Sequence, residues 1–274
     1  MPSPPTILVF DSGLGGLTVY RELATARPDA RFIYAADDAF FPYGGHGEFE
    51  LVERVLAVLG ELIAKWRPEL VVVACNTAST LVLPQLRKRF AVPFVGTVPA
   101  IKPACAASMS KLVSVLGTEA TVAREYTRAL IRDFAQGCAV TLVGSRRLAV
   151  LAEAALNGEA VANEDIACEI EPCFIAAGAA RTDTVVLACT HYPLLLDRLK
   201  NLAPWPVTFI DPAPAIARRV VELLGPPTSA EPASPVHLIF TSGRAPSPAL
   251  KSALARFGMA EIAGAAFDTL PNSP

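Results

Sequence analysis

The chain lacks the features that mark membrane proteins and nucleic-acid-binding proteins. No apolar run approaches the roughly 20 residues that a membrane-spanning helix needs. The formal net charge is only −2, which gives no electrostatic attraction to nucleic acid or to an anionic membrane. The N-terminal residues lack the basic region and long apolar stretch of a signal peptide. We therefore expect a cytoplasmic protein with neither nucleic acid nor membrane as a partner.

Charged residues are also few. They make up 18% of the 274 residues, against 52% hydrophobic ones, so there is ample material for large cores and little for disordered tails. The length exceeds that of a typical single domain and suits two.

The cysteines do not form a zinc motif. Cys168 and Cys173 are five residues apart, and no second pair of cysteines or histidines completes a site. We predict no metal, and reduced thiols throughout, as is usual in the cytosol. Cys105, Cys138, Cys168 and Cys173 are expected to be small buried hydrophobic residues.

The remaining two cysteines each end an apolar run. Residues 70–74 lead directly into Cys75, and residues 184–188 lead into Cys189. Neither run alternates with polar residues, which predicts parallel strands buried on both faces. Because open α/β sheets bind ligands beyond the carboxyl ends of their strands, the two thiols are expected at equivalent points of two similar units.

Strand and helix patterns alternate along the whole chain, which predicts an α/β protein. We expect two pseudo-symmetric doubly wound lobes with mainly parallel sheets and an active-site cleft between them. Lobe A would comprise residues 1–98 and 212–274 and carry Cys75, and lobe B would comprise residues 99–211 and carry Cys189. Within lobe B, helical patterns are expected over 119–134 and across 148–178.

A glycine-rich turn follows the first predicted strand, at 7–10. It reads Asp11-Ser12-Gly13-Leu14-Gly15-Gly16 and precedes a predicted helix, so its backbone N–H groups form a natural anion site. It does not have the G-x-G-x-x-G spacing of dinucleotide sites, and no P-loop lysine is present. The alternative is a simple tight turn. Asp11 and Ser12 favour a functional interpretation, in which they bind an ammonium group or orient a proton-transfer group.

A second shaped loop occupies residues 37–47 and contains Pro42, Tyr43 and three glycines. Its backbone N–H groups, including that of Gly44, and the Tyr43 hydroxyl are candidates for binding a carboxylate. The alternative is an ordinary rigid surface loop.

Two thiols that face one carbon atom can invert it without a cofactor. A thiolate near its free pKa of about 8.5 is a usable base at neutral pH, and its conjugate thiol is a usable acid. One thiol removes a proton from one face while the other delivers a proton to the opposite face. His191 is placed to relay protons to Cys189, and Asp11 has the same role beside Cys75. Neighbouring hydroxyl and amide side chains are suited to binding ammonium and carboxylate groups: Ser12, Asn76, Thr77 and Thr190.

These motifs resemble those of the glutamate racemases in the cofactor-independent aspartate/glutamate racemase superfamily. The resemblance rests on residues 10–19, 41–44, 74–78 and 188–194, with weaker matches at 115–118 and 210–211. Together they extend over most of the chain in the family's order.

The resemblance implies an isomerase that interconverts L- and D-glutamate with Cys75 and Cys189 as catalytic acid/base residues. Cys75 would take the proton from D-glutamate and Cys189 from L-glutamate. No cofactor is implied. D-glutamate would enter peptidoglycan synthesis, and hence cell wall biogenesis and cell shape, and the assembly would be a homodimer. Substrate contacts would fall on Asp11, Ser12, Tyr43, Gly44, Asn76, Thr77, Thr190 and His191.

The family also has an acidic residue in the second lobe that assists the histidine. Glu153 is the best match, but its flanking residues fit loosely, so it stays outside the predicted set.

Other functions remain open. An aspartate racemase, or another isomerase of the superfamily, would carry the same two cysteines. A binding protein that has lost catalysis would have no need of paired thiols, and a decarboxylase-like relative would lack one of them.

Overall fold

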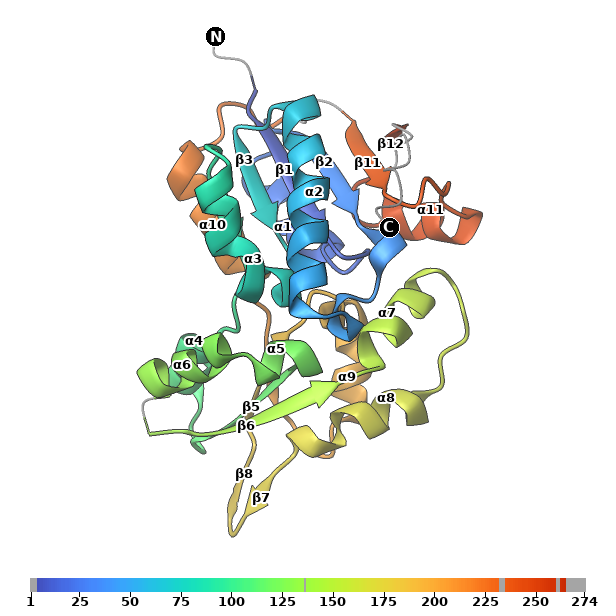
Figure 1. Cartoon of the computed structure of the whole chain (residues 1–274). Helices are drawn as coiled ribbons and strands as arrows, with labels where there is room; N and C mark the ends of the chain where they lie inside the picture. The colour runs from blue at the N-terminus through green and yellow to red at the C-terminus, as the bar shows by residue number, and fades with distance from the viewer. Residues whose placement is uncertain (1–3, 136, 232–234, 260–261, 265–274) are drawn as a thin grey trace.

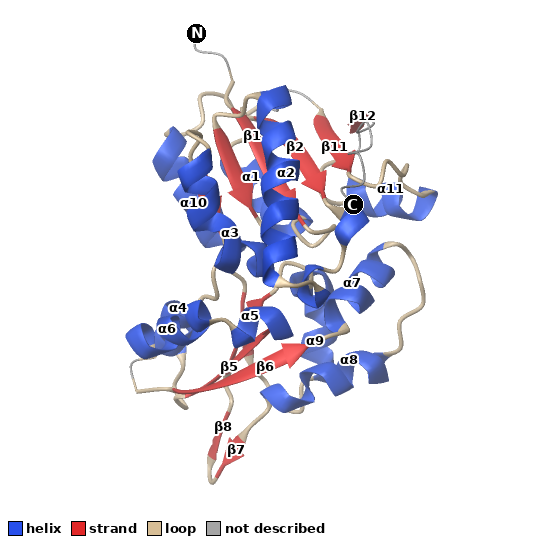
Figure 2. Cartoon of the chain, viewed as in Figure 1, coloured by secondary structure: helices blue, strands red, loops and turns tan. Residues whose placement is uncertain are grey.

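Two parallel β-sheets carry the fold (Figures 1 and 2). The structure, a computed structural model, describes residues 4–135, 137–231, 235–259 and 262–264. The six-stranded sheet has the order β12-β11-β2-β1-β3-β4. Its strands are β1 (Thr6–Asp11), β2 (Arg31–Ala36), β3 (Leu70–Val73), β4 (Phe94–Gly96), β11 (Val236–Phe240) and β12 (Ile262–Gly264). We call this sheet and its helices lobe A.

Helices cover both faces of the lobe A sheet. On one face α1 (Leu17–Ala26), α10 (Ala213–Leu224) and α11 (Pro248–Ala255) pack against Ile7 and Val9 of β1. On the other, α2 (Glu48–Trp66) and α3 (Asn76–Arg89) pack against Leu8 and Phe10. Alternate residues of one strand therefore enter two cores, which explains why the strand sequences are apolar without a break.

Lobe B is built on a four-stranded parallel sheet of order β10-β9-β5-β6. Its strands are β5 (Leu112–Thr118), β6 (Ala139–Ser145), β9 (Thr184–Ala188) and β10 (Thr208–Ile210). Helices α4 (Ile101–Ala107) and α6 (Glu125–Phe134) cover one face, and α7 (Leu148–Leu156), α8 (Asn163–Ile170) and α9 (Leu196–Leu202) cover the other. A short antiparallel hairpin, β7 (Ala176–Ala177) and β8 (Ala180–Arg181), projects away from lobe A (Figure 1).

The two sheets share one strand order. In lobe A it is β2-β1-β3-β4, and in lobe B it is β6-β5-β9-β10, so that each reads second, first, third, fourth strand of its unit when the small hairpin is set aside. Cys75 follows the third strand of lobe A and Cys189 follows the third strand of lobe B. In each sheet the second strand lies on one side of the first strand and the third strand lies on the other. The cysteines therefore lie at the topological switch points, where open α/β sheets bind ligands. The expectation of mainly parallel sheets in two similar units is confirmed.

Two predicted helical regions of lobe B are broken. The pattern over 119–134 forms α5 (Glu119–Ala123) and α6, which are separated at Arg124. There the Thr127 hydroxyl donates to the Thr121 carbonyl at 2.7 Å and replaces a helical hydrogen bond. The region over 148–178 contains two short helices, a 3-10 turn and the first strand of the hairpin. Gly158, at φ +86°, ends the first of these helices with a conformation that other residues rarely adopt.

The lobes interlock through apolar side chains. Leu156 of α7 is part of the lobe A core, and Phe41 packs against the lobe B core. The residue boundaries of the lobes given above stay a prediction. In the described part of the chain, every helix is too short or too polar to cross a membrane.

Candidate active site

Cys75 lies between β3 and α3, as the N-cap residue of that helix. The Cys75 side chain is buried beside Asp11, the last residue of the neighbouring strand β1, and beside Ser12, which follows it. Burial raises the pKa of Cys75 to about 12, and the Asp11 charge acts in the same direction, against smaller opposing effects of the Ala78 N–H and the Ser12 hydroxyl. The resting residue is therefore a thiol at neutral pH.

On the lobe B side, Cys189 belongs to a line of three polar side chains. The Cys189 Sγ lies 4.0 Å from His191 Nδ1, and His191 Nε2 lies 2.7 Å from Glu153 Oε2. Burial disfavours the imidazolium, but the hydrogen bonds to Cys189 and Glu153 outweigh it and raise the pKa of His191 well above its usual value. Burial also disfavours the Glu153 carboxylate, yet His191 outweighs it, so the pKa of Glu153 is lowered. A carboxylate thus supports an imidazolium that faces the thiol.

Glu153 fits the position that the sequence left uncertain. It comes from α7, 38 residues before His191, and its side chain reaches the histidine from another element of lobe B. Its distance along the chain explains why flanking residues alone gave only a loose match.

The glycine-rich turn of lobe A contacts Glu153 and His191 through its backbone N–H groups. The Leu14 N–H donates to Glu153 Oε2 at 3.0 Å, so the anion at this turn is a carboxylate of the protein itself. The Gly15 N–H lies 3.2 Å from His191 Nε2. Because Nε2 uses its proton toward Glu153, it cannot accept from Gly15 at the same time, and we interpret this approach as close packing. The absence of a side chain at Gly15 is what lets His191 come so near.

Asp11 joins the two lobes at their centre. Its Oδ1 accepts a hydrogen bond from the Thr190 hydroxyl at 3.0 Å, and its Oδ2 accepts one from the Gly13 N–H at 3.1 Å. Burial raises the pKa of Asp11, while the His191 charge opposes that rise. Asp11 also acts electrostatically on Cys75, so one carboxylate influences both halves of the site.

Three threonine hydroxyls meet across the lobes. Thr77 of α3 lies 3.0 Å from Thr118 and 3.2 Å from Thr121, and these two lie 2.9 Å apart. Thr118 ends β5 and caps α5, with its hydroxyl accepting from the Thr121 N–H. Thr118 and Thr121 were not among the predicted site residues. The weaker family match at residues 115–118, which includes Thr118, was the available signal.

Asn76 carries a buried amide whose nitrogen and oxygen both lack a partner among the described residues. A buried amide without hydrogen bonds is costly, so such a group is expected to bond to a ligand. Asn76 is the first residue of α3, directly after Cys75. Its amide is therefore a candidate for binding a ligand next to that thiol.

The Tyr43 hydroxyl does not serve the role expected of it. It donates to Asp37 Oδ2 at 2.6 Å, and Asp37 is also held by Arg54 and Thr241. A phenol has a single proton to donate, so this hydroxyl is not available to a carboxylate. The prediction for the Tyr43 hydroxyl is wrong, and only its backbone N–H remains a candidate.

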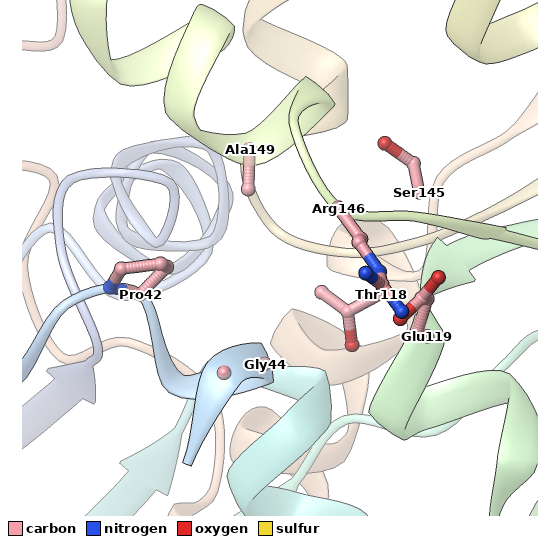
Figure 3. Close-up of a pocket in the computed structure, with 8 residues that line it drawn as sticks. Pro42, Gly44, Thr118, Glu119, Ser145, Arg146 and Ala149 are labelled. Atoms are coloured by element: carbon pink, nitrogen blue, oxygen red, sulfur yellow. The ribbon is translucent and has the colours of Figure 1, made fainter.

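A pocket of about 380 Å³ opens between the lobes next to the threonines (Figure 3). Pro42 and Gly44 come from lobe A, while Thr118, Arg146 and Ala149 come from lobe B (Figure 3). Gly44 is the member of the predicted set that lines it. Because Thr118 belongs to both the pocket and the hydroxyl cluster, the pocket lies next to the cluster that contains Thr77.

The remaining cysteines lie outside this arrangement. Cys105 and Cys173 are buried as expected, whereas Cys138 is half-buried and Cys168 is exposed on α8, so the expectation of burial is wrong for Cys168. Within the described ranges, no three His, Cys, Asp or Glu side chains gather in a way that could hold a metal ion.

Several known proteins are similar to this chain in both sequence and fold. The family model for Asp/Glu/hydantoin racemase matches residues 7–220. A glutamate racemase of Rhizobium meliloti is 54% identical over 261 residues, 94% of each chain, and one of Brucella ovis is 52% identical over 94% of this chain and 96% of its own. The crystal structure of Escherichia coli glutamate racemase in complex with L-glutamate and the activator UDP-MurNAc-Ala matches with a TM-score of 0.86 and 40% identity, over 96% of this chain and 98% of that one. The chain therefore belongs to the Asp/Glu/hydantoin racemase family and, within it, to the glutamate racemases.

Proposed function

We propose that the chain interconverts L-glutamate and D-glutamate by proton transfer at Cα between two cysteines, Cys75 and Cys189. The observation that carries this proposal is the equivalent placement of two buried thiols, one per lobe, with Asp11 acting on both halves of the site. The identity with glutamate racemases over nearly the whole chain supports glutamate as the substrate.

In the direction from L-glutamate, the Cys189 thiolate removes the Cα proton. The Cys75 thiol then delivers its own proton to the opposite face of the carbon. At the end Cys189 carries a proton and Cys75 is a thiolate, and proton exchange with the solvent restores the first state before the next L-glutamate reacts. The raised pKa of Cys75 supports its role as the resting proton donor. His191, supported by Glu153, stabilises the thiolate of Cys189.

The polar groups around the thiols lower the pKa of the substrate's α-hydrogen by stabilising the carbanion. An α-hydrogen of an amino acid is far less acidic than a thiol, so preorganised donors must stabilise the developing carbanion. We assign this role and the binding of the substrate's ammonium and carboxylates to seven groups: Asp11, Ser12, Asn76, Thr77, Thr190 and the backbone N–H groups of Tyr43 and Gly44. The Asn76 amide gives the strongest support for this assignment, because neither its nitrogen nor its oxygen has a hydrogen-bond partner among the described residues.

The remaining parts of the proposal follow from family membership. The product D-glutamate would supply peptidoglycan synthesis, the location would be the cytoplasm, and the assembly would be a homodimer. The division into lobe A, residues 1–98 and 212–274, and lobe B, residues 99–211, belongs to the same proposal.

Racemisation without an added cofactor tests the proposal. The purified chain, supplied with a metal chelator and no pyridoxal phosphate, is expected to convert L-glutamate to an equal mixture of enantiomers, as followed by chiral chromatography. L-aspartate in a parallel reaction is expected to stay unchanged. Conversion of aspartate alone would favour an aspartate racemase, and loss of neither substrate would contradict both functions.

A further inference from the structure

The C-terminal segment of lobe A returns to the active site after β11. Helix α11 contacts α7 of lobe B (Figure 1). A Cβ atom at Gly158, just after α7, would lie 3.1 Å from the Cβ of Ala249. Leu156 of α7 shares a core with Leu250 of α11. The loop between β11 and α11 is therefore held next to the helix that carries Glu153.

Arg244, in this loop, is fixed from several sides. Its Nε lies 2.8 Å from Asp38 Oδ2, and its guanidinium lies over the Phe240 ring, 5.2 Å from the centroid. Ser242 bonds to Asp38 through both its N–H and its hydroxyl, and the Ser242 hydroxyl oxygen accepts the Arg244 N–H at 3.2 Å. Although nearly half of the Arg244 side chain is exposed, its direction is set by lobe A.

The two oxygens of Glu153 have different partners. Oε2 is used by His191 and by the Leu14 N–H, at 2.7 and 3.0 Å. Oε1 faces Arg244 Nη2 at 3.9 Å. The carboxylate thus faces a cation from lobe A with one oxygen and is hydrogen-bonded to the histidine through the other.

We propose that Arg244 is a positioning residue, which fixes the Glu153 carboxylate and shares its negative charge with His191, so that it adjusts how readily His191 gives up its proton beside Cys189. The inference rests on the proposed function and deepens it, because it adds a member to the proton-transfer side of lobe B. Without Arg244 the whole charge of Glu153 would act on His191, and the imidazolium would hold its proton more tightly.

The charged groups around His191 fix the direction of the effect. His191 faces Cys189, Glu153 and Asp11, and Glu153 in turn faces Arg244. The cation of Arg244 contributes to the lowered pKa of Glu153. Removing a cation favours the protonated form of every nearby group, so the pKa of both Glu153 and His191 should rise in its absence.

Kinetics of single and double variants test the inference. Arg244→Gln is expected to lower kcat for L-glutamate about fivefold, the effect of one partly exposed ion pair, with KM changed less than about twofold. Arg244→Lys keeps the charge and should stay within about twofold of the parent. In a Glu153→Gln background, Arg244→Gln should cost less than about 1.5-fold, because its target is already neutral. Arg132→Gln, which removes an exposed partner of Glu125 on α6, is the matched control and should change nothing.

A substrate-free measurement completes the test. The chain has three histidines, so the NMR signals of the imidazoles can be assigned and titrated. The His191 titration should move to higher pH in Arg244→Gln and stay in place in Arg132→Gln. An unshifted titration, an equal loss of kcat in both Glu153 backgrounds, or normal kcat in Arg244→Gln would overturn the inference. A parent enzyme that leaves glutamate unchanged would count against the proposed function, and the titration would still decide the role of Arg244.

Discussion

Replacing either Cys75 or Cys189 by serine is expected to lower glutamate racemisation by about 10³-fold or more, in both directions. A hydroxyl has nearly the shape of a thiol but is a far weaker acid, so neither proton removal nor proton delivery stays accessible at neutral pH. General acid–base residues contribute about 10²–10⁴-fold each. In the proposed mechanism each cysteine is the base in one direction and the acid in the other, so its loss affects both directions. Initial rates from L-glutamate and from D-glutamate, measured separately, provide the test.

A third cysteine serves as the control for this pair. Cys168→Ser changes an exposed thiol on α8 and should keep the parental rate. All three variants should unfold within a few degrees of the parent, since the substitution removes little volume. If Cys75→Ser or Cys189→Ser kept a rate within tenfold of the parent, the two-thiol mechanism would be wrong.

Gly15→Ala should have the next largest effect, a loss of activity of about 10²-fold together with a loss of stability of about 1–3 kcal/mol. A Cβ atom at residue 15 would lie 2.4 Å from His191 Nδ1 and 2.6 Å from the His191 backbone nitrogen. A backbone atom cannot move aside as the end of a flexible side chain can. The His191 segment must therefore shift away from lobe A, and the alignment of His191 with Cys189 is lost.

Gly47→Ala provides the comparison. A Cβ atom at Gly47 would meet no other atom within 4 Å, so this variant should keep the parental rate. Because Gly47 is the N-cap residue of α2, where alanine is less favourable than glycine, its melting temperature should fall by at most a few degrees. The measurements are kcat with L-glutamate and thermal unfolding followed by circular dichroism. A Gly15→Ala variant as active as Gly47→Ala would show that the close approach of His191 to this turn is not needed.

The sequence allowed the positions of both thiols to be predicted because the signal is local. A strand buried on two faces has to be apolar throughout, and parallel strands end at one edge of their sheet, so a cysteine at the end of such a run can be placed without coordinates. Residues 70–74 and 184–188 satisfied this rule, and they contain β3 and β9, each the third strand of its unit in chain order when the small hairpin is set aside.

The partners of individual side chains could not be predicted in this way. The glycine-rich turn reads as an anion site, and it is one, but its anion is Glu153 from the other lobe. The Tyr43 hydroxyl reads as a free donor, yet it is bound by Asp37, six residues earlier. Arg244 gives no local signal at all, because its role depends on how α11 packs against α7. Helix periodicity and strand runs carry no information on such packing.

The position of deuterium after brief reaction in D2O tests the two-thiol account most directly. L-glutamate is incubated with the enzyme in D2O to low conversion, the enantiomers are separated, and mass spectrometry measures deuterium at Cα in each. Because one thiol removes the proton and a different, solvent-exchanged thiol delivers the replacement, the D-glutamate formed should carry deuterium while the remaining L-glutamate carries protium. D-glutamate that retains protium, or equal deuterium in both enantiomers, would show that a single base acts on both faces and would contradict the account.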